Sequence, residues 1–201
     1  MSKAWPARLT EGPVRLRPIR LRDKTAWTEV RSRNSSWLKP WDATSPDGPG
    51  DTLPSFATMV RHLSSEARAV RALPFVVEYH GRLVGQLTVG GISWGSLRAA
   101  HIGYWVDREV AGRGIIPTAV ALASDHCWSV LGLHRVEINI RPENTASCRV
   151  VEKLGFRYEG LRPRYLHIDG DWRDHRTYAL HIEEVPGGLL RRWVASRPVA
   201  P

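Results

Sequence analysis

The chain has 201 residues, of which 42% are hydrophobic and 24% are charged. This composition is typical of one folded domain, it excludes a disordered chain, and no apolar run is long enough to suggest a membrane-spanning helix. The 29 Lys and Arg against 20 Asp and Glu give a net charge of +9. That charge favours an anionic ligand or an RNA-rich partner such as the ribosome, although an arginine-rich composition alone would produce it as well.

The N-terminal half alternates strand-like and helix-like segments. Asp23 is suited to cap the first helix, and residues 42–54, rich in Pro, Gly and Asp, are expected to form a loop. Gly81 separates two segments that should pair as an antiparallel hairpin. The expected strands are residues 14–18, 74–80 and 82–90, and the expected helices are residues 24–33 and 58–71.

The centre of the chain is predicted to contain a strand, a glycine loop and a helix. Residues 99–106 form a strand-like run, residues 107–114 are polar and include Gly112 and Gly114, and helical spacing begins at Ile115. The first turn of a helix has free backbone N–H groups and partial positive charge, and glycines let an anion approach them closely. The pattern therefore predicts a phosphate-binding loop, with a plain tight turn into a core helix as the alternative.

The C-terminal half is predicted to add a strand at residues 134–140, a helix capped by Asn144, and a second hairpin whose turn is an Asp-Gly pair. The whole order of elements indicates a mixed α/β domain over residues 1–185. Residues 186–201 contain glycines, prolines and arginines, so we expect them to form a poorly ordered basic tail.

Two blocks resemble a known family: the loop EVAGRG (residues 109–114) and the segment ENTASCRVVEKLGF (residues 143–156). They resemble the GNAT (Gcn5-related N-acetyltransferase) superfamily, and with LRPIRLRD and GDWRDHRTYAL they are similar to ribosomal-protein-alanine N-acetyltransferases of the RimJ/RimL type. The resemblance spans about residues 14–180. It implies a single α/β (α+β mixed) domain in which helices flank a mixed, mostly antiparallel central sheet. The chain departs from the family at Glu109, where Gln or Arg is usual.

The resemblance implies acetyl-CoA as the acetyl donor, no metal, and direct transfer to an amine in a ternary complex. The implied acceptor is the N-terminal α-amine of a protein, with ribosomal proteins the leading candidates. The two cysteines fall among apolar residues of predicted helices, which indicates free buried thiols and a cytoplasmic location. We expect a monomer or homodimer that does not bind membranes. An α-amine has a pKa of about 7.7–8.0 against about 10.4 for lysine, so it needs only a mild base. The residues expected to bind coenzyme A are Trp105, Val106, Gly112, Arg113, Gly114, Ile115, Asn144 and Ser147.

Three side chains are candidates for proton transfer. Glu137 lies within the predicted strand, on the face opposite its apolar residues, and an apolar setting would raise its basicity, so it is the candidate base. A salt-bridged strand position is the alternative for Glu137. The resemblance implies Ser147 as the acid that protonates the departing thiolate, with Tyr165 as the alternative acid. Ser147 is equally well explained as an ordinary first-turn residue of its helix.

Loop aromatics are candidates for contact with the acceptor. Trp37, Leu38 and Trp41 follow the first helix, in a region that borders the acceptor in the resembling family. Trp172 and Asp174 on the last hairpin are the other candidates. Core packing is the alternative explanation for the tryptophans.

Three other functions fit the sequence in part. An acetyltransferase for a polyamine, amino acid or aminoglycoside would share the fold, but such cationic acceptors call for an acidic pocket, and this chain is basic. A dinucleotide-binding enzyme is disfavoured because Pro117 occupies the position of the third glycine. A non-catalytic basic ribosome- or RNA-binding module would leave the glycine loop and the capped second helix unexplained.

Overall fold

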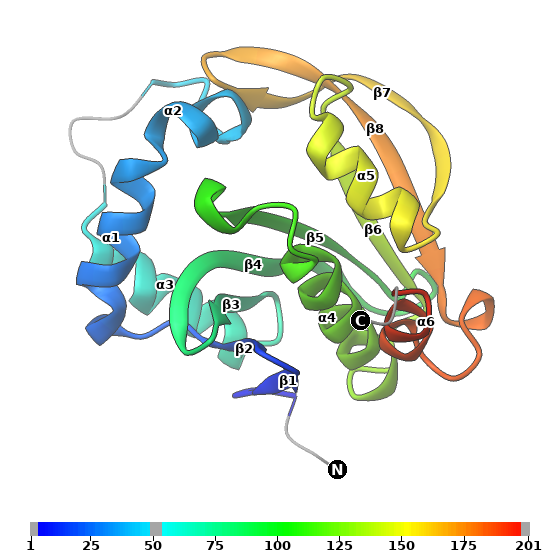
Figure 1. Ribbon diagram of the computed structural model, residues 1–201. Coiled ribbons are helices and arrows are strands. Elements are labelled where there is room, and N and C mark those ends of the chain that lie inside the picture. Colours follow the sequence, from blue (N-terminus) through cyan, green and yellow to red (C-terminus); the bar gives the residue numbers. More distant parts are fainter. Residues whose placement is uncertain (1–3, 49–53, 198–201) are drawn as a thin grey trace.

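The computed structural model describes residues 4–48 and 54–197, and its centre is one eight-stranded sheet in the order β1-β2-β3-β4-β5-β6-β8-β7 (Figure 1). The strands are β1 (Leu9–Glu11), β2 (Val14–Pro18), β3 (Leu73–Tyr79), β4 (Arg82–Ser93), β5 (Ala99–Val106), β6 (Arg135–Ile140), β7 (Arg157–Ile168) and β8 (Asp171–His181). The helices are α1 (Lys24–Arg33), α2 (Ser35–Leu38), α3 (Phe56–Arg68), α4 (Ile115–Ser129), α5 (Thr145–Lys153) and α6 (Leu189–Ala195). Within the described ranges, no helix is both long and apolar enough to cross a membrane.

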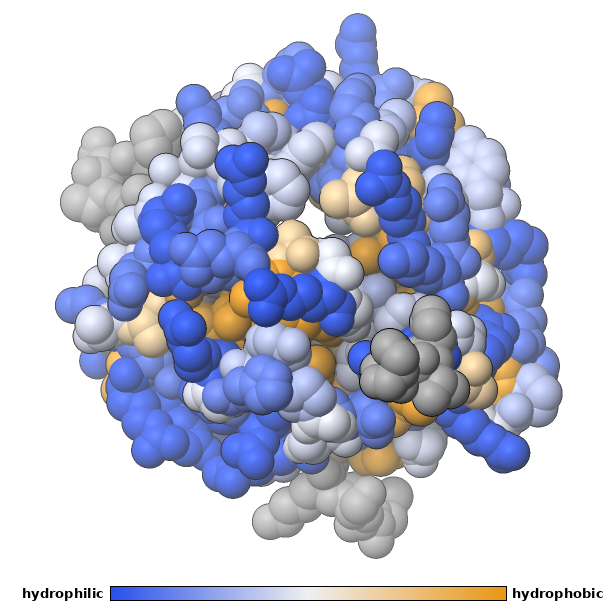
Figure 2. Space-filling view, in the orientation of Figure 1, coloured by the Kyte–Doolittle hydropathy of each residue, from blue (hydrophilic) through white to orange (hydrophobic). Residues whose placement is uncertain are grey.

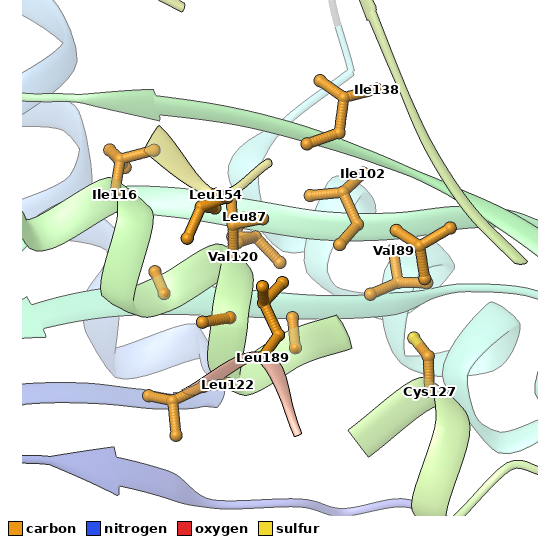
Figure 3. Packing of buried hydrophobic residues seen from close by; sticks show 14 of the residues in the cluster. Leu87, Val89, Ile102, Ile116, Val120, Leu122, Cys127, Ile138, Leu154 and Leu189 are labelled. Atoms are coloured by element: carbon orange, nitrogen blue, oxygen red, sulfur yellow. The ribbon is translucent and has the colours of Figure 1, made fainter. Parts of the chain in front are cut away.

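Helices cover both faces of the sheet. On one face α4 packs between the strands and the helices α5 and α6, so nearly every one of its residues is buried. Figure 3 shows Val120 of α4 near Leu87 of β4, Ile102 of β5 and Leu189 of α6 in this core. On the other face α1 and α3 pack through a smaller apolar cluster against β3 and β4. The predicted mixed, mostly antiparallel sheet with flanking helices is therefore confirmed.

The only parallel pair in the described sheet, β5 and β6, creates the opening on which the site depends. The two strands pair only from Ala99 to His101 on β5. Beyond that point β5 stays with β4, whereas β6 pairs with β8. In Figure 1 the helices α1 and α2 lie on one side of the resulting gap and α5 lies on the other, while β7 and β8 arch above it.

Most of the helices and strands predicted from neighbouring residues are present in the structure. The strand at 99–106, the helix at 24–33 and the hairpin around Gly81 lie where the sequence predicts them. The helix predicted at residues 58–71 is α3. It begins at Phe56, earlier than predicted, because Ser55 caps it by accepting the N–H of Thr58 at 3.1 Å. Asp23 does precede α1, but its carboxylate binds Arg17 at 2.8 Å and does not cap the helix by a side-chain hydrogen bond.

The expected tail differs most from the structure. Residues 189–195 form α6, which packs on α4 and buries Leu189 and Trp193. Asp125 of α4 accepts the first free N–H groups of this helix, from Leu189 at 2.7 Å and from Leu190 at 3.0 Å. The predicted disordered tail at 186–201 is therefore wrong for α6, and its last four residues lie outside the described range.

Candidate active site

A cavity of about 770 Å³ lies where β5 and β6 separate. Five of the described parts of the chain line it: the middle of β4, the end of β5, the glycine loop with the first turn of α4, the helix α5 with the residues before it, and the segment around α2. Figure 2 shows this side of the molecule hollowed near its centre, with apolar side chains inside the hollow and charged ones around it. A cavity of this size with apolar walls and a few polar groups is typical of a small-molecule site.

The glycine loop has a backbone conformation that only glycine adopts readily, and it lies against the cavity. Gly112 and Gly114 line the cavity and have φ values of 82° and 76°, in the left-handed region that other residues avoid. Gly114 directly precedes α4, so the free N–H groups of that helix begin beside the cavity. Arg113 is not among the lining residues; its guanidinium donates to the carbonyl of Glu109 at 3.4 Å.

A buried carboxylate braces this loop against α1. Asp107 accepts from Asn34 Nδ2 at 2.9 Å and also binds the guanidinium of Arg33. Asn34 in turn accepts the N–H of Arg108 at 3.0 Å. Burial alone would raise the pKa of Asp107, but the bonds from Arg33 and Asn34 outweigh it and hold the pKa below its ordinary value of 3.8.

Asp107 should therefore make folding sensitive to acid. A lowered folded-state pKa stabilises the protein above the ordinary pKa, and this contribution is lost as the pH falls through the folded-state value. Asp107→Asn is expected to lower the free energy of unfolding by about 1–2 kcal/mol at pH 7, since Arg33 is partly exposed, and by less near pH 3. Urea unfolding between pH 3 and pH 7 measures this loss of unfolding free energy. Glu29→Gln removes an exposed partner of the same arginine and should have almost no effect; an equal loss for both variants would contradict the account.

The start of α5 presents a second set of polar groups. Asn144 caps the helix, as predicted, by accepting the N–H of Ser147 at 3.0 Å, and both residues line the cavity. The Tyr104 hydroxyl is buried beside Ser147 and has no hydrogen-bond partner of normal geometry among the described residues. Burial raises the pKa of Tyr104 far above its ordinary value, so the phenol stays protonated. A buried hydroxyl facing a cavity without a partner is suited to a polar ligand.

Further charged and polar side chains line the cavity. Arg149 and Lys153 of α5 line it and provide two cations. Gln86 and Thr88 of β4 also line it, and Gln86 accepts from Trp27 Nε1 at 2.9 Å. Sequence reasoning missed these four residues together with Tyr104, because only the pairing of β4 with β5 and the approach of α5 bring them to one space.

Glu137 and Tyr165 lie outside the cavity lining. One oxygen of Glu137 binds Arg135 at 2.7 Å and the other binds Arg162 at 3.2 Å. Both carboxylate oxygens of Glu137 are therefore occupied by guanidinium groups outside the cavity lining. Tyr165 packs on His175 at 5.7 Å between ring centroids. The contacts of Glu137 thus favour its structural interpretation over the role of base.

The acceptor candidates divide into two groups. Trp37 and Leu38 of α2, and Trp41 shortly after it, line the cavity. Trp172 and Asp174 do not line it: Trp172 packs on a neighbouring histidine of the hairpin, and Asp174 accepts a backbone N–H within the same hairpin at 2.8 Å. Of the eight predicted coenzyme A residues, all except Arg113 line the cavity.

Comparison with known proteins assigns the family. The acetyltransferase (GNAT) domain family matches residues 14–157. The structure of Mycobacterium smegmatis RimJ in complex with CoA-disulfide is similar with a TM-score of 0.89 and 42% identity, covering 96% of each chain. Probable N-acetyltransferase YjcK of Bacillus subtilis is 40% identical over 99 residues, which are 49% of this chain and 55% of that protein.

Two relatives with named acceptors align over most of the chain. [Ribosomal protein uS5]-alanine N-acetyltransferase of Escherichia coli is 27% identical over 177 residues, covering 86% of this chain and 90% of that protein. Spermidine N(1)-acetyltransferase of Escherichia coli is 27% identical over 188 residues, covering 88% and 94%. With a family match over more than half of its length, the chain belongs to the GNAT family of N-acetyltransferases, enzymes that use acetyl-CoA as their acetyl donor.

Proposed function

We propose that the enzyme transfers the acetyl group of acetyl-CoA to the N-terminal α-amine of a protein, with a ribosomal protein as the leading candidate. The observation that carries the proposal is the cavity at the β5–β6 opening, which is lined both by the glycine loop that precedes α4 and by aromatic residues. Similarity to RimJ in complex with CoA-disulfide and to a ribosomal-protein-alanine N-acetyltransferase supports it.

The glycine loop and the start of α4 hold the diphosphate in this proposal. The N–H groups at Gly114 and Ile115 are free of intrahelical partners, and the helix dipole adds partial positive charge. Arg149 and Lys153 of α5 line the same cavity and supply positive charge for the negative groups of the ligand. Acetyl-CoA supplies the acetyl group as a thioester.

The end of β5 orients the reacting end of the ligand. Trp105 and Val106 line the cavity past the point where β6 leaves β5, so backbone groups on that edge are available to a ligand. Such N–H groups stabilise negative charge on a carbonyl oxygen during acyl transfer. The Ser147 hydroxyl lies across the cavity at the start of α5, where it donates a proton to the departing thiolate, and the buried Tyr104 hydroxyl lies beside it.

A polyamine acceptor is the second candidate, because spermidine N(1)-acetyltransferase is among the similar proteins. A polycation needs carboxylates without other partners. Two carboxylates of the described residues line the cavity, and both are paired: Asp42 with Arg31 at 2.7 Å and Glu143 with Arg141 at 3.3 Å. This pairing favours a protein N-terminus, which carries at most one positive charge at the reacting end.

Mass spectrometry of acetylated peptides tests the acceptor. We expect the full-length enzyme with acetyl-CoA to add one acetyl group to a ribosomal-protein peptide that has a free N-terminal alanine and an internal lysine. The same peptide with a blocked N-terminus should stay unmodified, and spermidine should be a poorer substrate. Acetylation of the lysine in the blocked peptide, or a preference for spermidine, would contradict the proposal.

A further inference from the structure

A chain of hydrogen bonds joins the C-terminal helix to the glycine loop. Trp193 of α6 is buried, and its Nε1–H donates to the Thr118 hydroxyl of α4 at 2.8 Å. The Thr118 hydroxyl donates to the carbonyl of Gly114 at 2.9 Å, and the Thr118 N–H donates to the same carbonyl at 3.1 Å. Gly114 lines the cavity, so this series of hydrogen bonds runs from α6, through Thr118 of α4, to the wall of the site.

The chemistry of the groups fixes the direction of this chain. An indole N–H is only a donor, so Thr118 must accept from Trp193. A hydroxyl has a single proton, and Thr118 therefore directs its own proton to the Gly114 carbonyl. Hydrogen bonds in such a series polarise one another, which strengthens the bond to the carbonyl. The indole ring also backs the loop, since a Cβ added to Gly114 would lie 3.4 Å from Trp193 Cζ2.

Holding the Gly114 carbonyl fixes an N–H group on the cavity side. The peptide between Gly114 and Ile115 is planar and trans, so its N–H points opposite to its carbonyl. The carbonyl points into α4 toward Thr118, and the Ile115 N–H therefore points out of the start of the helix, beside the cavity. Glycine at 114 has little backbone stiffness of its own, so the orientation of this peptide depends on what binds its carbonyl.

We propose that Trp193 is a positioning residue for coenzyme A: through Thr118 it sets the direction of the peptide N–H that receives the diphosphate. This inference rests on the proposed function, because it takes the start of α4 as the diphosphate site. The C-terminal helix thereby contributes to donor binding without touching the ligand.

A double-mutant cycle tests the chain. Trp193→Phe keeps an aromatic ring and removes the donor, and Thr118→Val keeps the shape and removes the hydroxyl. Each is expected to raise the Kd for CoA, measured by calorimetry, by about fivefold, the effect of one hydrogen bond of ordinary strength. Because both side chains act through the same carbonyl, the Kd for CoA of the double variant should also rise about fivefold, and not by the product of the two single effects. The kcat at saturating acetyl-CoA should be unchanged.

Controls separate positioning from general loosening of the fold. Thr118→Ser keeps the hydroxyl and should bind CoA like the wild type, which tests the bond without altering α6. Leu190→Ala weakens the packing of α6 and should lower the melting temperature while leaving the Kd for CoA unchanged. An unchanged Kd in Trp193→Phe, or effects that multiply in the double variant, would overturn the inference. Failure of the wild type to bind CoA would instead overturn the proposed function.

Discussion

Gly85→Ala is expected to lower the free energy of unfolding by about 2–3 kcal/mol and to displace β5 at the cavity. Gly85 pairs with Val106 across β4 and β5. A Cβ at this position would collide with the carbonyl oxygen of Trp105 and lie 3.2 Å from the Cα of Val106. Both are backbone atoms, which have no rotamer to move away, so the strand itself must shift. Urea denaturation measures the loss of stability, and the displaced strand should also weaken CoA binding.

The neighbouring strand offers a matched control. Gly103 lies on β5, two residues before Trp105, and a Cβ added there meets nothing within 4 Å. Gly103→Ala should therefore leave stability within about 0.5 kcal/mol of the wild type, as ordinary surface substitutions do. Equal stabilities for the two alanine variants would show that β4 and β5 are not packed as described at Gly85.

Ser147→Ala is expected to lower kcat for acetyl transfer by about 100-fold, a far larger effect than its effect on the Kd for CoA. Ser147 lines the cavity at the start of α5, and its backbone N–H, not its hydroxyl, is used by the Asn144 cap. The hydroxyl is therefore available to protonate the departing thiolate. Steady-state kinetics with a peptide acceptor, with calorimetry for CoA, separates the catalytic effect from binding.

A neighbouring position again supplies the control. Thr145 also lines the cavity in the first turn of α5, and Thr145→Val should leave kcat near the wild-type value because no proton transfer is assigned to it. An unchanged kcat in Ser147→Ala would remove Ser147 from the role of acid. Tyr104→Phe would then be the variant to examine, since its buried hydroxyl lies beside Ser147.

The parts of the site that the sequence predicted well are those encoded by neighbouring residues. Gly112 and Gly114 adopt left-handed backbone conformations within one loop. Asn144 caps α5 by accepting the N–H of Ser147, which is only three residues further along the sequence. These interactions need no knowledge of distant segments. The same is true of β5, whose bounds match the prediction at both ends.

The parts that the sequence missed depend on contacts between distant segments. Glu137 was placed correctly on the face opposite the core, but its partner Arg162 lies 25 residues away and reaches it only through the pairing of strands. The helix α6 is stabilised by Asp125, more than 60 residues earlier, so its composition alone resembles a loose basic tail. Tyr104 meets Ser147 only because β5 and β6 diverge.

A structure of the enzyme bound to CoA tests the central claim most directly. The account predicts the diphosphate within hydrogen-bond distance of the backbone N–H groups at Gly114 and Ile115, with the thiol end between the end of β5 and Ser147. A diphosphate bound elsewhere on the protein, or a thiol end outside the β5–β6 opening, would contradict it.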